Sequence, residues 1–293
     1  MKKLKRYQYE RYAVLCKLAY PHSIDHVALG YAVDGYAEIS NHRQQVIARI
    51  LWQHDKKEVV VVFRGSQSIG DWLINLCCLP RRKCFKTPIS DSVTAENSNN
   101  TPEPNNSFNK EASNIASAPK YYVHWGYDHL LNQRVQKEIA GVSQSVSIYQ
   151  QIQAIVEPLI AQGKRISLTG HSSGGAMAIL AADRLERQFP RAIKRVVTFG
   201  QPAAGFRSFK RHYLLHLRTY RICCDLDIIT FLPPLPGVFV HVGRSLWLHN
   251  ERIYENIVPA LRFYKTLVSW VISPISYHYM HKYIRNKDFF DKH

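Results

Sequence analysis

The segment Gly170 to Gly175, with the sequence GHSSGG, is the feature that most constrains the fold of this chain. Before it, residues 165–169 have the pattern of a short β-strand, and after it residues 176–189 carry apolar side chains at helical spacing. A serine flanked by glycines between a strand and a helix is typical of a nucleophile elbow, a sharp turn that exposes the serine above a sheet. The flanking glycines fit because a Cβ would keep the strand and the helix apart. The sequence therefore predicts that Ser172 is a nucleophile in a strained backbone conformation.

Strand and helix signals alternate along the rest of the chain. Residues 45–52 alternate between apolar and polar, residues 59–63 form an apolar run, and residues 196–199 form another. Strand, helix and strand in succession imply an α/β fold with a mostly parallel central sheet flanked by helices. We also expect an N-terminal helix near residues 7–20 and a long helical stretch over residues 124–162.

One domain over residues 1–293 accounts for the chain, because 46% apolar content supplies a sizeable core. Residues 86–119 differ from the rest: they are rich in Asn, Ser, Thr, Pro and Glu, which predicts a disordered insertion. The sequence lacks GxGxxG, GxxxxGK and HExxH motifs, so it gives no reason to expect a dinucleotide, a nucleoside triphosphate or a metal. We expect no cofactor.

A serine nucleophile requires a histidine base and normally a carboxylate that orients the histidine. Asp225 and Asp227 follow the strand-like residues 216–222 and precede Leu232-Pro233-Pro234, so both are candidates for the acid. Of the histidines beyond them, His278 and His281 are the leading candidates for the base. The others are His241 in an apolar segment, His249, and His293 at the last position.

Four separated stretches resemble the class 3 lipase family, the fungal-lipase-like branch of the α/β hydrolases. They are residues 61–66 with Asp71-Trp72, residues 123–127, residues 168–176, and residues 227–234 with His278 beyond. Together they follow the order of the family over nearly the whole chain. The resemblance implies an α/β-hydrolase fold with its nucleophile elbow at Ser172.

By this resemblance Ser172 is the nucleophile, Asp227 the acid and His278 the general base. The spacing to Leu232-Pro233-Pro234 matches the family at Asp227, which selects Asp227 over Asp225 as the acid. A methionine and then a tyrosine follow His278, as in the family, which favours His278 over His281 as the base. One departure is Thr230, where the family usually has a proline after the acid.

Acyl transfer also requires donors aimed at the oxyanion, each lowering the barrier by about 3 kcal/mol. The amide of Ser173, directly after the nucleophile, is the first expected donor. The resemblance implies that Ser66 supplies the second through its amide and hydroxyl. We expect His124 to be a structural histidine.

A lid helix follows the first oxyanion loop in the family, and residues 71–79 occupy that place. They are amphipathic, and Arg81, Arg82 and Lys83 follow directly. A mobile apolar element with a basic edge is therefore expected beside the site. The alternative is a packed surface helix with a solvated charge run.

The formal net charge of +17 favours anionic surfaces such as acidic lipid headgroups. The basic residues are dispersed and no nucleic-acid motif occurs, so nucleic acid is not an expected partner. The leading hypothesis is a lipase acting on acylglycerols or phospholipids at a lipid surface. The alternatives are an esterase or thioesterase for short soluble substrates, and a silent protein that binds anionic surfaces. Polar residues after the basic N-terminus predict no classical signal peptide, and hence a cytoplasmic or membrane-peripheral location.

Overall fold

The computed structural model describes residues 4–20, 34–66, 79–84, 120–139, 141–225, 227–235, 237–257, 261–262, 264 and 276–292. The predicted insertion at residues 86–119 lies outside these ranges, and so does the predicted lid at residues 71–79 apart from Leu79. Both stay predictions. None of the described helices is long and apolar enough to cross a membrane.

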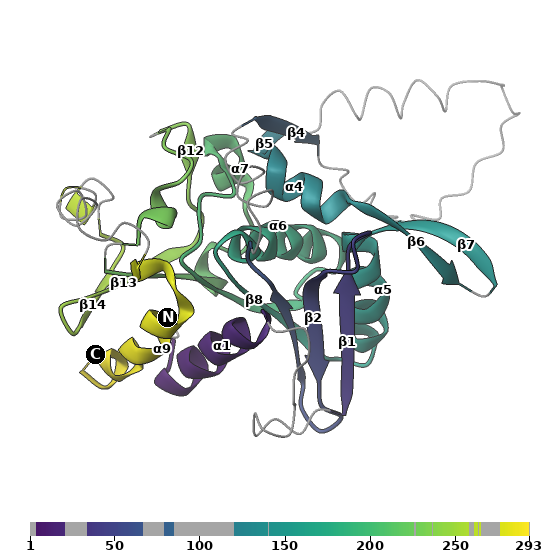
Figure 1. The fold of residues 1–293 in the computed structure, drawn as a ribbon, viewed down its shortest axis with the longest axis horizontal. Coiled ribbons are helices and arrows are strands. Elements are labelled where there is room, and N and C mark those ends of the chain that lie inside the picture. Colours follow the sequence, from purple (N-terminus) through teal and green to yellow (C-terminus); the bar gives the residue numbers. More distant parts are fainter. Residues whose placement is uncertain are drawn as a thin grey trace, which may run out of the picture.

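Helices and strands alternate over most of the chain (Figure 1). The α-helices are α1 (Arg6–Leu18), α4 (Trp125–Asn132), α5 (Ile148–Ala161), α6 (Ser173–Gln188), α7 (Arg207–His212) and α9 (Met280–Arg285). The 3₁₀ helices are η1 (His216–Arg218), η2 (Ile228–Phe231), η3 (Ser276–His278) and η4 (Asn286–Lys292). The strands are β1 (Gly35–Ser40), β2 (Val46–Trp52), β3 (Glu58–Phe63), β4 (Pro80–Cys84), β5 (Lys120–His124), β6 (Arg134–Ile139), β7 (Val142–Ser147), β8 (Arg165–His171), β9 (Ile193–Phe199), β10 (Gly205–Phe206), β11 (Thr219–Cys224), β12 (Phe239–Val240), β13 (Arg244–His249) and β14 (Arg252–Glu255).

The central sheet has eight strands in the order β1-β2-β3-β8-β9-β11-β13-β14. The five neighbouring strands β3, β8, β9, β11 and β13 run parallel to one another. The outer strands β1, β2 and β14 pair antiparallel with their neighbours. A smaller sheet has the order β12-β10-β5-β4. The predicted mostly parallel sheet with flanking helices is confirmed.

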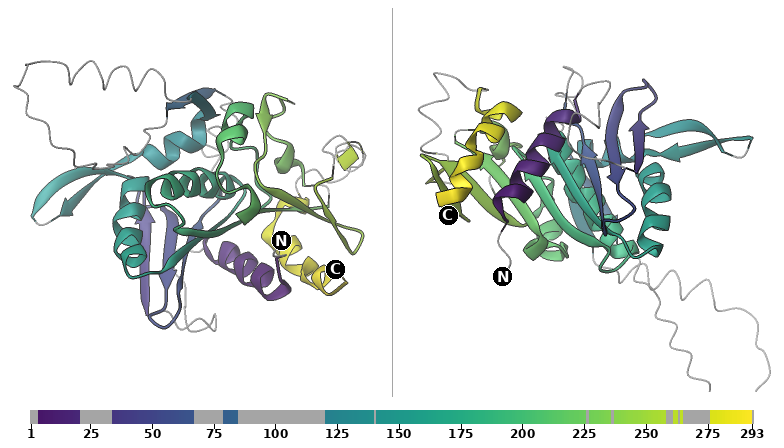
Figure 2. Two further views of the ribbon diagram at one scale, coloured as in Figure 1. Left: turned by 180° about the vertical axis from the view of Figure 1, so that it is seen from behind. Right: turned by 90° about the horizontal axis from the view of Figure 1, so that it is seen from below.

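Helices cover both faces of the sheet, and strand β3 shows why its apolar run is continuous. Val59, Val61 and Phe63 belong to the core that contains α4, α5 and α6. Val60 and Val62 belong to the opposite core, which contains α1 and α9. A parallel strand buried on both faces needs an apolar side chain at every position. The two views in Figure 2 show α1 and α9 side by side.

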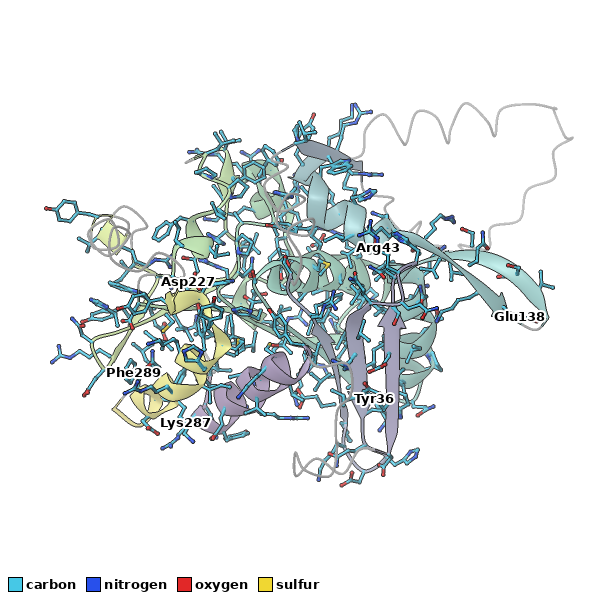
Figure 3. All side chains as sticks on the ribbon, viewed as in Figure 1. Tyr36, Arg43, Glu138, Asp227, Lys287 and Phe289 are labelled. Atoms are coloured by element: carbon cyan, nitrogen blue, oxygen red, sulfur yellow. The ribbon has the colours of Figure 1, made fainter. Side chains whose placement is uncertain are left out.

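The predicted long helix over residues 124–162 is wrong. Helix α4 ends at Asn132, a hairpin of β6 and β7 follows, and α5 begins at Ile148. Gly141 makes the hairpin turn with a φ of +77°. Ser147 and Gln150 form a capping box that starts α5. The hairpin extends away from the body of the molecule, and Glu138 lies near its tip (Figure 3).

Candidate active site

The GHSSGG segment forms a sharp turn between β8 and α6. β8 ends at His171 and α6 begins at Ser173, so Ser172 is the joining residue, with φ 58° and ψ −132°. A Cβ on Gly170 would lie 2.4 Å from the backbone of Gly174, and one on Gly174 would lie 2.5 Å from the carbonyl oxygen of Phe63. The turn therefore requires glycine at both positions, because strand, turn and helix touch through their backbones.

Asp227 lies three residues after the end of β11, at the start of η2, and its side chain is buried. Both of its carboxylate oxygens are 3.0 Å from Nδ1 of His278. The amide of Ile229 donates to Oδ1, and the hydroxyl of Tyr283 donates to Oδ2. Burial alone would raise the pKa of Asp227, but the charge interaction with His278 and the hydrogen bonds from His278 and Tyr283 outweigh it and lower this pKa. The carboxylate is thus held ionised against the imidazole.

The end of β9 lies against both Ser172 and this acid–base pair. The amide of Ser172 donates to the carbonyl of Phe199 at 2.9 Å. The next residue, Gly200, has φ +56°, and a Cβ there would lie 2.6 Å from Oδ2 of Asp227 and 3.0 Å from the ring of His278. The ring of His171, the neighbour of Ser172, packs 4.5 Å from the His278 ring. Segments far apart in sequence therefore gather at the carboxyl ends of β8, β9 and β11. Figure 3 places Asp227 there, where α9 meets the sheet.

The rival acid and base from the sequence face elsewhere. Asp225 accepts from Nδ1 of His249 at 3.0 Å, and its carbonyl accepts from Trp247. His281 is exposed on α9 and stacks on Tyr279. His241 is bound through Nε2 to the carbonyl of Thr230, and His293 lies outside the described residues.

The two predicted oxyanion residues lie together. The hydroxyls of Ser66, just beyond β3, and of Ser173, the first residue of α6, are 2.9 Å apart. The loop of Ser66 also approaches the nucleophile closely, because a Cβ on Gly65 would lie 3.2 Å from Cβ of Ser172. The predicted structural histidine, His124, is fully buried and accepts from the amide of Gly126 at the start of α4.

Sequence reasoning missed two groups that hold the acid. The first is Tyr283, the tyrosine of the pattern after His278, whose hydroxyl donates to Asp227. Thr230 stands where the family usually has a proline, and its hydroxyl donates to the carbonyl of Asp227 at 2.7 Å and accepts from Arg262. A hydroxyl thus ties down the loop where a proline is usual in the family.

Comparisons with known proteins identify the family of this chain. The model of the family "Lipase (class 3)" matches residues 60–237, more than half of the chain. Phospholipase A(1) DAD1, chloroplastic, of Arabidopsis thaliana is 30% identical over 77% of this chain and 42% of its own length. A lipase of Rhizomucor miehei is 25% identical over 67% of this chain and 43% of its own length. The chain thus spans about two fifths of the length of each.

Solved structures show the same fold. The structure of the native Rhizomucor miehei lipase propeptide complex superposes with a TM-score of 0.58, at 19% identity, over 94% of this chain and 79% of that one. A triacylglycerol lipase with a serine protease triad as its catalytic centre superposes with a TM-score of 0.55, at 19% identity, over 84% of this chain and 80% of that one. The predicted α/β-hydrolase fold is therefore confirmed, and the chain belongs to the class 3 lipase family.

Proposed function

We propose that this chain hydrolyses the acyl esters of lipids through an acyl-enzyme intermediate, with Ser172, His278 and Asp227 as its catalytic residues. The observation that carries the proposal is the buried Asp227–His278 pair packed against the turn that holds Ser172. A carboxylate that fixes a histidine beside a strained serine is the constellation used for acyl transfer.

In the proposed reaction, His278 removes the proton of the Ser172 hydroxyl as its oxygen attacks the ester carbonyl. The resulting imidazolium is stabilised by Asp227, and it then donates the proton to the departing alcohol oxygen. Water repeats the sequence on the acyl-enzyme and releases the fatty acid, which restores Ser172.

The oxyanion of each tetrahedral intermediate requires donors that are already in place. The Ser173 amide at the start of α6 is one, and the positive end of the helix macrodipole adds to it. Ser66 is the second, because its hydroxyl is held against Ser173 and its loop lies beside Ser172. Each donor lowers the barrier by about 3 kcal/mol.

Lipid esters are the proposed substrate class because similar proteins are named as enzymes that hydrolyse them. These are a phospholipase A(1), a triacylglycerol lipase and a secreted mono- and diacylglycerol lipase. A thioesterase or an esterase for short soluble acyl groups would use the same residues. A catalytically silent protein is disfavoured, because an unused site would not need an ionised carboxylate buried against a histidine.

The first experiment measures hydrolysis of p-nitrophenyl esters of increasing chain length. We expect Ser172→Ala to lose hydrolysis while retaining its thermal midpoint, and a fluorophosphonate probe to label Ser172 in the wild type. Labelling of another serine, or full activity of the variant, contradicts the assignment. A rate that declines steadily with chain length favours the short soluble substrates.

A second experiment compares the two neighbouring histidines. We expect His278→Ala to lose several orders of magnitude in kcat, since a triad works as a unit. His281→Ala, the matched control on the exposed face of α9, should change kcat less than about twofold. The reverse order would transfer the base to His281.

We further propose that the enzyme works at anionic lipid surfaces. Exposed apolar side chains support this: Leu79 precedes β4, and Leu235 and Val238 precede β12, at opposite edges of the smaller sheet. On β4 itself, Asp128 holds Arg81 and Lys83, while the side chain of Arg82 is exposed. The cytoplasmic, membrane-peripheral location stays a prediction.

The test of the surface proposal uses one ester in neutral and in anionic vesicles across a salt series. We expect faster hydrolysis on anionic vesicles at low salt, because exposed charges attract such surfaces within about 10 Å at 0.1 M salt. Arg82→Gln should lose part of this gain, whereas Lys56→Gln, which removes an exposed charge just before the amino end of β3 in the central sheet, should keep it. Equal rates on both vesicles would contradict the proposal.

A further inference from the structure

We infer that Tyr20 and His171 form a hydrogen-bonded bridge that positions three loops of the active site relative to one another: the loops of Ser66, Ser172 and His278. This inference rests on the proposed function. Neither residue is proposed to touch the substrate, so both are positioning residues.

The first part of the bridge joins the nucleophile turn to the histidine loop. Nε2 of His171 is 2.6 Å from the backbone carbonyl oxygen of His278. A carbonyl oxygen can only accept, so Nε2 of His171 carries the hydrogen. The contact fixes the backbone of His278 itself, while Asp227 holds the side chain.

The second part joins the nucleophile turn to the residue that follows α1. Nδ1 of His171 is 2.6 Å from the hydroxyl of Tyr20. Burial, strengthened by the nearby charge of His278, lowers the pKa of His171 to about 3, so its ring is neutral. With the hydrogen on Nε2, Nδ1 must accept and the Tyr20 hydroxyl must donate. The tautomer of His171 is thus set from both sides.

The third part joins Tyr20 to the oxyanion loop. The amide of Gly65 donates a hydrogen bond to the Tyr20 hydroxyl oxygen. A Cβ on Gly65 would lie 2.3 Å from that oxygen and 2.7 Å from the carbonyl oxygen of His171, so glycine is required for this approach. The next residue is Ser66. The complete chain runs from the Gly65 amide through Tyr20 and His171 to the carbonyl of His278.

Both ends of this chain are backbone groups, one donor and one acceptor, so it transmits no proton. Its effect is geometric: it links the loop after β3, the turn after β8 and the loop before α9 through two side chains. A displacement of about 1 Å at reacting groups can cost about 100-fold in rate, so such links matter for kcat more than for binding. Tyr20 follows α1, which packs on the sheet in the core that also holds Met280 and Tyr283 of α9.

The test measures kcat and KM on a short soluble ester, with enzyme concentrations fixed by fluorophosphonate titration. We expect Tyr20→Phe to lower kcat about tenfold and His171→Leu to lower it up to about 100-fold, with KM changed less than about twofold. His171→Gln should recover most of the loss, because its amide nitrogen reaches the position of Nε2 and can donate to His278.

Matched controls come from similar contacts distant from the site. His216 also bridges, with Nδ1 accepting from the Gly243 amide and Nε2 2.7 Å from the Lys210 carbonyl. The buried hydroxyl of Tyr213 bonds to that of Thr219 at 2.8 Å. His216→Leu and Tyr213→Phe should lower the thermal midpoint at most and leave kcat within about twofold.

A double-mutant cycle separates a bridge from two independent contacts. If the two side chains act as one chain, Tyr20→Phe combined with His171→Leu should have nearly the kcat of His171→Leu alone. Additive losses, a loss confined to KM, or kcat values that match the controls would overturn the inference. Failure of the proposed function is recognised separately, because wild type and Ser172→Ala would then hydrolyse the ester equally.

Discussion

Ser172 has a φ of 58° and a ψ of −132°, a region of backbone space that residues other than glycine rarely occupy. Holding such a residue costs about 1–3 kcal/mol, which the surrounding strand and helix must supply. The strained turn places the Ser172 side chain above the sheet, at the start of α6. The strain belongs to the backbone, so it persists in any variant that keeps a Cβ.

The first prediction concerns that strain. We expect Ser172→Gly to be more stable than Ser172→Ala by about 1 kcal/mol, although glycine is normally the worse residue in an ordered segment. Glycine adopts the observed φ and ψ freely, whereas alanine retains the strain. Urea unfolding of the two inactive variants gives the difference, and an alanine variant as stable as the glycine one would show that the turn is relaxed.

The second prediction distinguishes the two neighbouring aspartates. We expect Asp227→Asn to lower kcat by roughly 10⁴-fold, because an amide no longer holds the His278 tautomer that accepts a proton. Asp225→Asn is the matched control, since its carboxylate faces His249, and it should cost less than about tenfold. Steady-state kinetics on one soluble ester decides the order, and equal losses would contradict the assignment of Asp227.

At the scale of elements, sequence patterns were sufficient where one local rule decided the structure. The β-branched run in β3 specifies a strand buried on both faces, and the glycines around Ser172 specify a close turn between strand and helix. Both features were predicted. The prediction of one helix from α4 to α5 was wrong because the apolar residues of this segment are few and Gly141 allows a hairpin turn with a positive φ. The contacts between Tyr20, His171 and His278 join residues that are distant in sequence, so no local pattern could reveal them.

Helix α1 packs on the sheet through an apolar core, and one carboxylate of the sheet adds hydrogen bonds to it. Glu58 on β3 accepts from Arg11 and Tyr12 of α1, each at 2.8 Å, and from Ser167 of β8. Lys194 lies 3.3 Å away. Burial alone would raise the pKa of Glu58, but these hydrogen bonds and positive charges lower it to about 2.

The third prediction follows from the pKa of Glu58. A carboxylate whose folded pKa lies below its unfolded value stabilises the fold above the unfolded value, near pH 4.3, and loses that effect as pH falls toward 2. We expect Glu58 to contribute about 3 kcal/mol at neutral pH and to lose it between about pH 5 and pH 2.

Urea midpoints at pH 7 and pH 3 measure this loss in the wild type and in Glu58→Gln. The variant should start less stable and lose less on acidification. Glu255→Gln, which breaks a more exposed pair with Arg244, serves as the control and should follow the wild type. Parallel acid curves for the wild type and Glu58→Gln would contradict the depressed pKa.

Over the whole molecule, the two terminal helical segments, α1 and α9 with η4, form a single layer (Figure 2), and α9 follows the loop of His278. Tyr9 on α1 donates to the carbonyl of Tyr283 on α9 at 2.6 Å, and its ring packs 4.5 Å from Phe290. Two ion pairs at the edge, Arg6 with Asp288 and Glu10 with Lys287, are largely exposed and contribute less than about 1 kcal/mol each. The stability of this layer therefore depends on Tyr9 more than on the charges.

The last prediction is that this layer opens on its own before the sheet unfolds. Tyr9→Phe keeps the ring but removes the hydrogen bond that the Tyr9 hydroxyl donates to the Tyr283 carbonyl, at a cost of about 1 kcal/mol. If α9 detaches locally, amide hydrogen exchange should accelerate about fivefold in residues 280–290 and stay unchanged in α6. Lys287→Ala, which removes only an exposed ion pair, should leave both segments within about twofold. Equal acceleration in α6 and α9 would instead mean that the termini and the sheet unfold as one unit, and that the histidine loop is as stable as the core.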